Sequence, residues 1–154
     1  MNESRARVAV VDDHPLFRER LCELINSEAD MEVCGEAEGA GEALELIRAT
    51  LPNLAIVDIT LKASSGLELI KNMKASSMGV PVLVLSMHEE SLYADRALRA
   101  GASGYVTKSQ EAAEVLIAIR SVLGGKTYLS CEMTADLLTS FRPTGTRGVR
   151  RSVE

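Results

Sequence analysis

The sequence has no tryptophan, little cysteine and proline, and no long apolar run. Its three cysteines, Cys22, Cys34 and Cys131, are odd in number, irregularly spaced and without a CxxC pair, so they indicate neither a disulfide framework nor a zinc site. The longest apolar stretch is far shorter than the roughly 20 residues of a membrane-spanning helix. The polar start from Met1 to Arg7 predicts no signal peptide. These absences favour a cytoplasmic protein with reduced thiols and no membrane partner.

Aromatic residues are also scarce, at 3% of the chain, so the core must be aliphatic. Apolar residues make up 46%, and most of them are alanine, valine, leucine and isoleucine. This profile is typical of a parallel sheet that is buried under helices on both faces. A length of 154 residues allows one domain of ordinary size with a short extension.

Charge is distributed unevenly. Residues 142–154 contain four arginines and one glutamate, and subtracting this +3 from the total of −5 leaves −8 for the preceding 141 residues. An acidic body argues against a nucleic-acid surface in the folded part, because phosphate backbones attract basic surfaces.

Short apolar runs alternate with helical patterns five times. The predicted strands are Val8–Val11, Met31–Ala37, Leu54–Asp58, Pro81–Ser86 and Gly104–Val106. The first predicted helix begins at Pro15. Four more predicted helices cover residues 41–51, 66–75, 89–100 and 109–123. This alternation predicts an α/β fold, a doubly wound parallel sheet with right-handed crossovers, and it has too few units for an eight-fold barrel.

The last part of the sequence differs from the rest. We expect a domain over residues 1–125 and a linker-like segment over 126–154. Ser130 could cap a short helix over 131–141, and the basic tail after Pro143 has the composition of a disordered segment.

Polar residues stand where the apolar strands end. Asp12 and Asp13 follow the first strand, Asp58 and Ser86 end the third and fourth, and Lys108 comes just after the fifth. Carboxyl ends of parallel strands share one edge of the sheet, so neighbouring first and third strands would bring three carboxylates together. A divalent cation such as Mg²⁺ would offset their repulsion, and a phosphoryl group could then bind to the cation and the lysine.

Each of these residues also has a plain structural interpretation. An aspartate at a strand end often forms a turn or a helix cap, and Asp13 stands two residues before Pro15. Ser86 alone suggests a cap, and Lys108 alone a solvated charge. The joint pattern, with each residue at the correct end of a different strand, favours the functional site.

Four stretches of the chain, within about residues 5 to 125, resemble the signature segments of two-component response-regulator receiver domains. They are VAVVDDHPLFRERL, LAIVDITLKASSGLELIKNMK, VPVLVLSMHEES and ALRAGASGYVTKS, in this order. The DDHP, SMH and GASGYVTK segments are most similar to the NarL/FixJ (LuxR-type) subfamily. The resemblance implies a flavodoxin-like sheet with the strand order 2-1-3-4-5.

The resemblance also implies a signalling switch rather than a metabolic enzyme. A sensor histidine kinase would supply the phosphoryl group to Asp58, and the domain would assist its own dephosphorylation. The implied roles are Mg²⁺ binding by Asp12, Asp13, Asp58 and the main-chain carbonyl of Thr60, phosphoryl contact by Lys108 and Ser86, and an aromatic switch at Tyr105 that follows Ser86. Without the resemblance, Tyr105 would be interpreted as a half-buried strand aromatic.

The chain departs from the family pattern at several positions. Lys62 and Ser109 replace prolines that many relatives have, so a cis-proline after Lys108 is excluded. Thr60 and His88 flank the site and are expected to tune the phosphoryl lifetime, although His88 could equally be an ordinary exposed loop residue. The subfamily usually continues into a helix-turn-helix output domain that binds DNA, and we expect that domain to be absent from residues 126–154. A homodimer remains open as a further assembly.

Three other functions would use part of the same residue pattern. A Mg²⁺-dependent phosphohydrolase would use Asp58 as nucleophile, but such enzymes carry a second aspartate two residues later, where this chain has Thr60. A flavodoxin-like cofactor carrier needs a phosphate-cradling loop after the first strand, where DDHP places two negative charges. A receiver that is never phosphorylated stays possible, and Mg²⁺ binding would distinguish it.

Overall fold

Five parallel strands lie in one sheet in the order β2-β1-β3-β4-β5, which confirms the predicted fold class and strand order. The protein is represented by a computed structural model, which describes residues 5–59, 66–87 and 91–129. The strands are β1 (Ala6–Val11), β2 (Met31–Ala37), β3 (Leu54–Asp58), β4 (Val82–Ser86) and β5 (Gly104–Thr107). The helices are α1 (Pro15–Asn26), α2 (Ala40–Thr50), α3 (Gly66–Ala75), α4 (Ser91–Ala100) and α5 (Ala112–Leu123).

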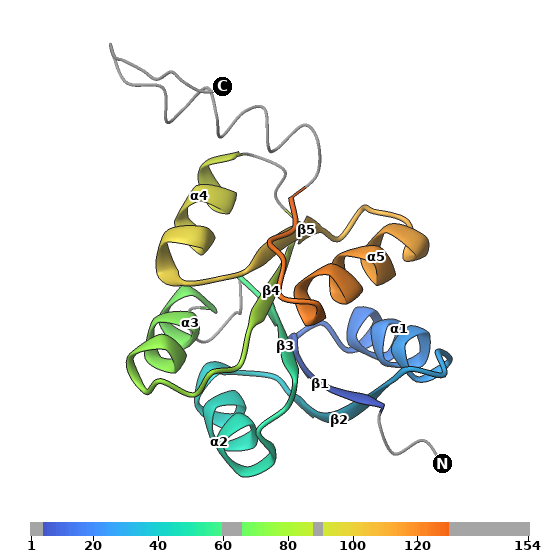
Figure 1. The fold of residues 1–154 in the computed structure, drawn as a ribbon, viewed down its shortest axis with the longest axis horizontal. Helices are drawn as coiled ribbons and strands as arrows, with labels where there is room; N and C mark the ends of the chain where they lie inside the picture. The colour runs from blue at the N-terminus through green and yellow to red at the C-terminus, as the bar shows by residue number, and fades with distance from the viewer. Residues whose placement is uncertain (1–4, 60–65, 88–90, 130–154) are drawn as a thin grey trace.

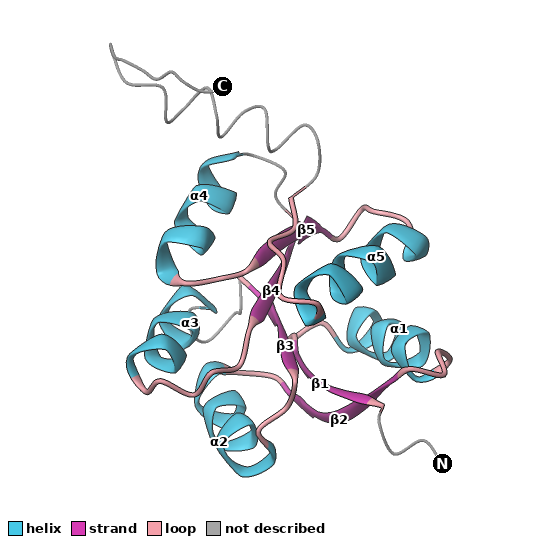
Figure 2. Cartoon of the chain, in the orientation of Figure 1, coloured by secondary structure: helices cyan, strands magenta, loops and turns pink. Residues whose placement is uncertain are grey.

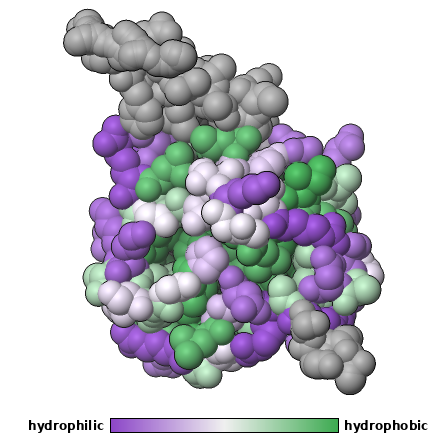
Figure 3. Space-filling view, in the orientation of Figure 1, coloured by the Kyte–Doolittle hydropathy of each residue, from purple (hydrophilic) through white to green (hydrophobic). Residues whose placement is uncertain are grey.

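Helices cover both faces of this sheet. Helices α1 and α5 lie on one face, and α2, α3 and α4 lie on the other (Figures 1 and 2). Successive strand residues alternate between the faces, so Val8 and Val10 pack with α1 and α5 while Ala9 and Val11 pack with the other helices. Because helices cover both faces, the strands carry apolar side chains on both sides. On the face seen in Figure 3, hydrophobic side chains appear in small separate groups between hydrophilic ones.

Element boundaries differ from the predicted ones by a few residues. The last main helix begins at Ala112 and not at 109, because the main-chain N–H of Gln110 donates to Thr107 in a turn before the helix. Leu51 lies just after α2 with a φ of 44°, in the left-handed conformation that commonly ends a helix. Strand β4 begins after Pro81. The predicted helix over 131–141 and the basic tail lie outside the described residues.

The segment after α5 returns to the sheet. The main-chain N–H of Tyr128 donates to Ser103, and that of Tyr105 donates to Tyr128, both at 3.0 Å. A Cβ on Gly104 would lie 3.2 Å from the Tyr128 carbonyl oxygen, so the glycine allows this close approach. Residues 126–129 therefore cover the outer edge of β5, although the sequence assigned them to the linker; the boundary at 125 stays a prediction.

Arg120 ties α5 to the loop between α1 and β2. Its guanidinium donates to both carboxylate oxygens of Asp30, at 3.0 and 2.9 Å, and to Glu28 at 2.7 Å. The hydrogen bonds that Arg120 donates lower the pKa of Asp30, and its hydrogen bonds to the two carboxylates raise the pKa of Arg120. This contact fixes α5 beside α1 on their common face.

Two predictions from the sequence concern the cysteines and membrane-spanning helices. Cys22 and Cys34 are both free, and burial raises the pKa of Cys22 to about 12, so its thiol is neutral at physiological pH. In the described part of the chain, no helix has the length and apolar content that a membrane crossing requires.

Gly66 provides a test of how closely α3 packs against the end of β3. A Cβ at this position would lie 2.4 Å from the main-chain oxygen of Asp58 and 2.8 Å from Cα of Ile59. We predict that Gly66→Ala lowers the free energy of unfolding by about 1–3 kcal/mol in urea titrations, because backbone must move to admit the methyl group. The matched control is Gly41→Ala in α2, where a Cβ meets nothing within 4 Å. That variant should gain about 0.5–1 kcal/mol from helix propensity, and equal behaviour of the two variants would contradict the prediction.

Candidate metal centre

Two buried aspartates meet at the carboxyl edge of the sheet. Strand β1 pairs with β3 so that Val11 stands opposite Val57, and the next residues along each strand are Asp12 and Asp58. Both aspartates are 1% exposed. The prediction that the first and third strands are neighbours is confirmed, and it is this pairing that brings the two carboxylates together.

Lys108 joins the two aspartates from across the sheet. Its Nζ lies 2.8 Å from Oδ2 of Asp12 and 3.0 Å from Oδ2 of Asp58, and its side chain is only 5% exposed. The ammonium also lies 4.6 Å from the centre of the Phe17 ring, within the range of a cation–π contact. Lys108 follows β5, and β4 separates β5 from β3 in the sheet. Its side chain therefore crosses the end of β4 to reach the carboxylates, and it is not a solvated charge.

Asp13 and His14 complete the cluster at its mouth. The Nδ1 atom of His14 lies 3.1 Å from Asp12, 3.4 Å from Asp13 and 3.6 Å from Asp58, measured to the nearest carboxylate oxygens. One possible ligand atom from each of these four residues lies within 4.8 Å of the others. His14 has no role in the sequence analysis, although its place directly after the acidic pair was a usable signal.

Local hydrogen bonds shape the loop that carries Asp12 and Asp13. The main-chain N–H of His14 donates to Oδ1 of Asp12 at 2.8 Å, so Asp12 does form the turn contact that is common for a strand-end aspartate. His14, and not Asp13, is the N-cap residue of α1, and the His14 side chain makes no capping hydrogen bond. Asp13 therefore does not occupy the N-cap position, and its carboxylate is part of the cluster.

Arg18 of α1 contacts the same loop, and the sequence analysis did not predict this contact. Its Nη1 donates to the main-chain oxygen of Asp12 at 2.6 Å, and its Nε donates to Glu36 at 3.1 Å. The side chain is 15% exposed. In the sequence, Arg18 was one of several polar residues between the apolar positions of a helix, so its contact with Asp12 could not be distinguished from a solvated charge.

The donor set suits a hard divalent cation. Carboxylate oxygens dominate it, and such oxygens are the ligands that Mg²⁺ prefers. Oδ2 of Asp12 is buried and accepts no hydrogen bond of good geometry, although the ammonium of Lys108 is close to it. A buried carboxylate oxygen in that condition would gain from coordination to a cation. Thr60 and His88, and with them the carbonyl ligand and the tuning positions, lie outside the described residues, as does Lys62.

Ser86 and Tyr105 belong to the other face of the sheet. Ser86 ends β4 opposite Thr107, and Tyr105 stands opposite Val84. Tyr105 packs in the hydrophobic cluster under α2, α3 and α4 and is fully buried. It is therefore more buried than the half-buried strand aromatic expected without the family resemblance. The main-chain N–H of Lys108 donates to the Ser86 carbonyl at 2.7 Å. The main chain at the end of β4 is thus hydrogen-bonded directly to Lys108, which contacts the two aspartates. The switch roles of Ser86 and Tyr105 stay predictions.

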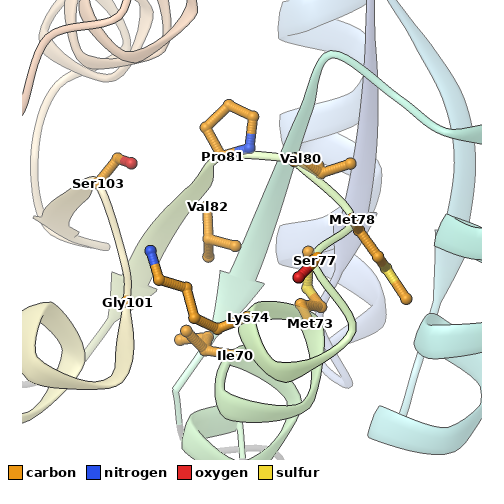
Figure 4. A pocket seen from close by; sticks show the side chains of 11 residues that line it. Ile70, Met73, Lys74, Ser77, Met78, Val80, Pro81, Val82, Gly101 and Ser103 are labelled. Carbon is orange, nitrogen blue, oxygen red and sulfur yellow. The ribbon is translucent and has the colours of Figure 1, made fainter.

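A cavity of about 480 Å³ lies at the opposite edge of the sheet, where β4 begins (Figure 4). Ile70, Met73 and Val82 give it an apolar wall, and Lys74, Ser77 and Ser103 add polar groups. The stem of Lys74 packs close to Gly101, since a Cβ on that glycine would lie 3.1 Å from Cδ of Lys74. This cavity shares no lining residue with the carboxylate cluster, so we assign it no part in the chemistry of the cluster.

The sequence matches one family model over most of its length and is similar to known transcription regulators. The model of the response regulator receiver domain matches residues 8–120. The chain is 31% identical to the transcriptional regulatory protein DegU of Brevibacillus brevis, over 92% of this chain and 60% of that protein. It is 36% identical to the virulence-factor transcription regulator BvgA of Bordetella pertussis, over 85% of this chain and 62% of that protein. The chain thus spans less than two thirds of the length of these relatives.

Solved structures agree with the sequence comparison. A LuxR-family two-component response regulator from Aurantimonas superposes with a TM-score of 0.84 at 37% identity, covering 89% of this chain and 98% of that one. The signal receiver domain of a NarL-type regulator from Mycobacterium tuberculosis gives a TM-score of 0.77 at 32% identity, covering 80% and 99%. The resemblance to the NarL/FixJ subfamily is confirmed by these neighbours.

The contact of Lys108 with two buried carboxylates predicts how stability depends on divalent cations. Lys108→Met should lower the free energy of unfolding by about 3 kcal/mol in the presence of EDTA, because buried carboxylates lose their countercharge. Added Mg²⁺ should then stabilise the variant more than the original protein, since a cation that binds only the folded state supplies that countercharge.

The control for this experiment is Lys71→Met, which removes a lysine that is 59% exposed. It should unfold like the original protein with and without Mg²⁺. Urea titrations of all three proteins give the comparison, and an Mg²⁺ response of Lys108→Met no larger than that of the control would refute the role assigned to the ammonium.

Proposed function

This chain belongs to the receiver-domain family of response regulators, and on that premise we propose that it is a phospho-acceptor switch in which Asp58 is phosphorylated by a sensor histidine kinase. One observation carries the proposal: the carboxylates of Asp12 and Asp58 both lie within 3.0 Å of the Lys108 ammonium, in a buried position at the ligand-binding edge of the sheet. The protein works as a signalling switch, and the chemistry that it performs on itself serves that switch.

The proposed reaction is phosphoryl transfer to a carboxylate. An oxygen of Asp58 attacks the phosphorus atom of a kinase phosphohistidine, and the P–N bond breaks. The imidazole leaves with the electron pair and takes up a proton, and an acyl phosphate remains on Asp58. Lys108 supports the reaction because its ammonium already lies 3.0 Å from the reacting carboxylate and can contact the incoming phosphoryl oxygens. Hydrolysis of the acyl phosphate at the same site would reset the switch.

A metal ion belongs to this proposal. Asp12, Asp13 and Asp58 would hold Mg²⁺ together with the main-chain carbonyl of Thr60. When bound, the ion supplies positive charge to the phosphoryl oxygens. Residues of the chain orient the ligands of the ion. Arg18 fixes the main chain at Asp12, and the hydrogen bond from His14 N–H fixes the Asp12 side chain, so the acidic pair is oriented before the ion arrives.

The output of the switch depends on β4 and β5. We propose that the hydroxyl of Ser86 bonds to the phosphoryl group, that the following loop with His88 moves with it, and that Tyr105 changes its conformation in the space this leaves. The surface formed by α4, β5 and α5 would change as a result. Shifting such an equilibrium from 1:99 to 99:1 takes about 5.5 kcal/mol, which a few charge-assisted hydrogen bonds to the phosphoryl group can supply.

The relatives named above are transcription regulators, and this supports a proposal for the whole protein. We propose that the receiver controls transcription through a helix-turn-helix domain outside residues 1–154, and that this domain, not the receiver, contacts DNA. The kinase partner and the place of action, the cytoplasm, follow from the same reasoning. A homodimer of receivers is compatible with this function.

Treatment with acetyl phosphate and Mg²⁺ tests the proposed function. The intact mass should increase by one phosphoryl group, and trapping of the acyl phosphate followed by peptide mapping should place it on Asp58. Asp58→Asn should abolish the increase. Asp95→Asn changes an aspartate of α4 that pairs with Arg99 and is not one of the cluster residues, and it should leave the increase intact. Modification of another residue in the original protein would overturn the assignment.

A further inference from the structure

His14 faces every charged group of the candidate centre through a single atom. Its Nδ1 lies 3.1 Å from Oδ1 of Asp12 and 3.1 Å from Nζ of Lys108, with Asp13 and Asp58 at 3.4 and 3.6 Å. The side chain is 47% exposed and stands at the mouth of the cluster, while Asp12 and Asp58 form its buried floor. His14 thus occupies the place from which one more ligand could reach an ion held by the floor.

Neither neutral tautomer of His14 satisfies these contacts. With a proton on Nδ1, the imidazole donates to Asp12 but points its N–H toward the ammonium of Lys108 at 3.1 Å. Without that proton, Nδ1 accepts from Lys108 but turns its lone pair toward three carboxylate groups within 3.6 Å. A cation between them would accept the lone pairs of the imidazole and of the carboxylates together. The buried Oδ2 of Asp12 has the Lys108 ammonium 2.8 Å away but accepts no hydrogen bond of good geometry, so it could also coordinate an ion at this position.

An imidazole ligand changes which ions a carboxylate site prefers. Mg²⁺ takes oxygen ligands and gains little from nitrogen, whereas Co²⁺, Ni²⁺ and Zn²⁺ bind imidazole well. Three carboxylates with one histidine form a mixed donor set that a first-row transition ion can use in full. A purely oxygen-lined site would discriminate much less between these ions and Mg²⁺.

We propose that His14 is a direct ligand in this centre and determines its metal specificity, so that the site binds transition ions such as Co²⁺ much more tightly than Mg²⁺. This inference rests on the metal site of the proposed function and adds a residue and a selectivity to it. Its consequence is regulatory: a transition ion that reaches the site competes with Mg²⁺ for Asp12, Asp13 and Asp58. The receiver would then respond to the supply of such ions as well as to its kinase.

Calorimetric titration of the full chain with Mg²⁺ and with Co²⁺ tests the proposal without any activity measurement. The original protein should bind both ions, with competition between them showing a shared site. His14→Ala should weaken Co²⁺ binding by about 10–100-fold and change Mg²⁺ binding by less than about twofold, because only the nitrogen ligand is lost. The visible absorption bands of bound Co²⁺ should shift in the variant, since they report the ligands directly.

The controls distinguish this inference from the function on which it rests. Glu19→Gln changes an exposed carboxylate on α1 and should leave both titrations unchanged. Equal weakening of Mg²⁺ and Co²⁺ in His14→Ala, or loss of Co²⁺ binding in His88→Ala instead, overturns the role of His14 and leaves the phospho-acceptor proposal standing. Absence of binding by both ions to the original protein overturns the metal site itself, and with it both proposals.

Discussion

The carboxyl edge of the sheet depends on one interaction, in which the ammonium of Lys108 lies between the buried carboxylates of Asp12 and Asp58. Asp12 and Asp58 stand at the ends of paired strands and are almost completely buried, and the ammonium of Lys108 lies 2.8 and 3.0 Å from their carboxylates. Two carboxylates in such a position repel each other unless a cation offsets them, and a lysine that is itself buried is stabilised by them in return. Asp13 adds further negative charge at the mouth, so the cluster stays acidic with Lys108 in place. That excess is what makes a divalent cation a natural ligand of this edge.

Strand alternation separates the charged cluster from Tyr105. Val10, Ile56 and Val106 point toward α1 and α5, and continuing the alternation by two residues directs Asp12, Asp58 and Lys108 to the same side. Val84 and Tyr105 point toward α4, and Ser86 continues their side at the end of β4. The charged cluster and the aromatic therefore lie on opposite faces of the sheet, and in the proposed switch a signal between them would pass through the strand ends. The hydrogen bond from Lys108 N–H to the Ser86 carbonyl connects the two. Tyr105 is in turn connected to the segment after α5, because its main-chain N–H donates to the carbonyl of Tyr128.

Much of this could be predicted from the sequence because the pattern is local. Apolar runs such as Leu54–Val57 that end in Asp58 identify both a buried strand and its functional end. Helix periodicity places Leu21 and Ile25 inward, as the structure has them. Element ends were less certain, since turns such as the one from Thr107 to Gln110 depend on hydrogen bonds that two or three residues decide. His14 and Arg18 were missed for a different reason. Their roles come from distances to residues of other elements. The place of His14 directly after the acidic pair was a usable signal, whereas an arginine at the start of a helix has no local pattern that indicates such contacts.

The sequence by itself determined the class of fold, the list of acidic residues and the family, because each of these is written in periodicity or in short motifs. Tertiary structure alone decided how these residues combine. Crossover connections place β1 beside β3 and leave β4 between β3 and β5, so Lys108 reaches Asp58 over a neighbouring strand end from 50 positions away in the chain. The same packing turns Nδ1 of His14 toward three carboxylates and an ammonium at once. Electrostatic interaction depends on separation in space and on burial, and neither quantity can be read from the order of residues along the chain.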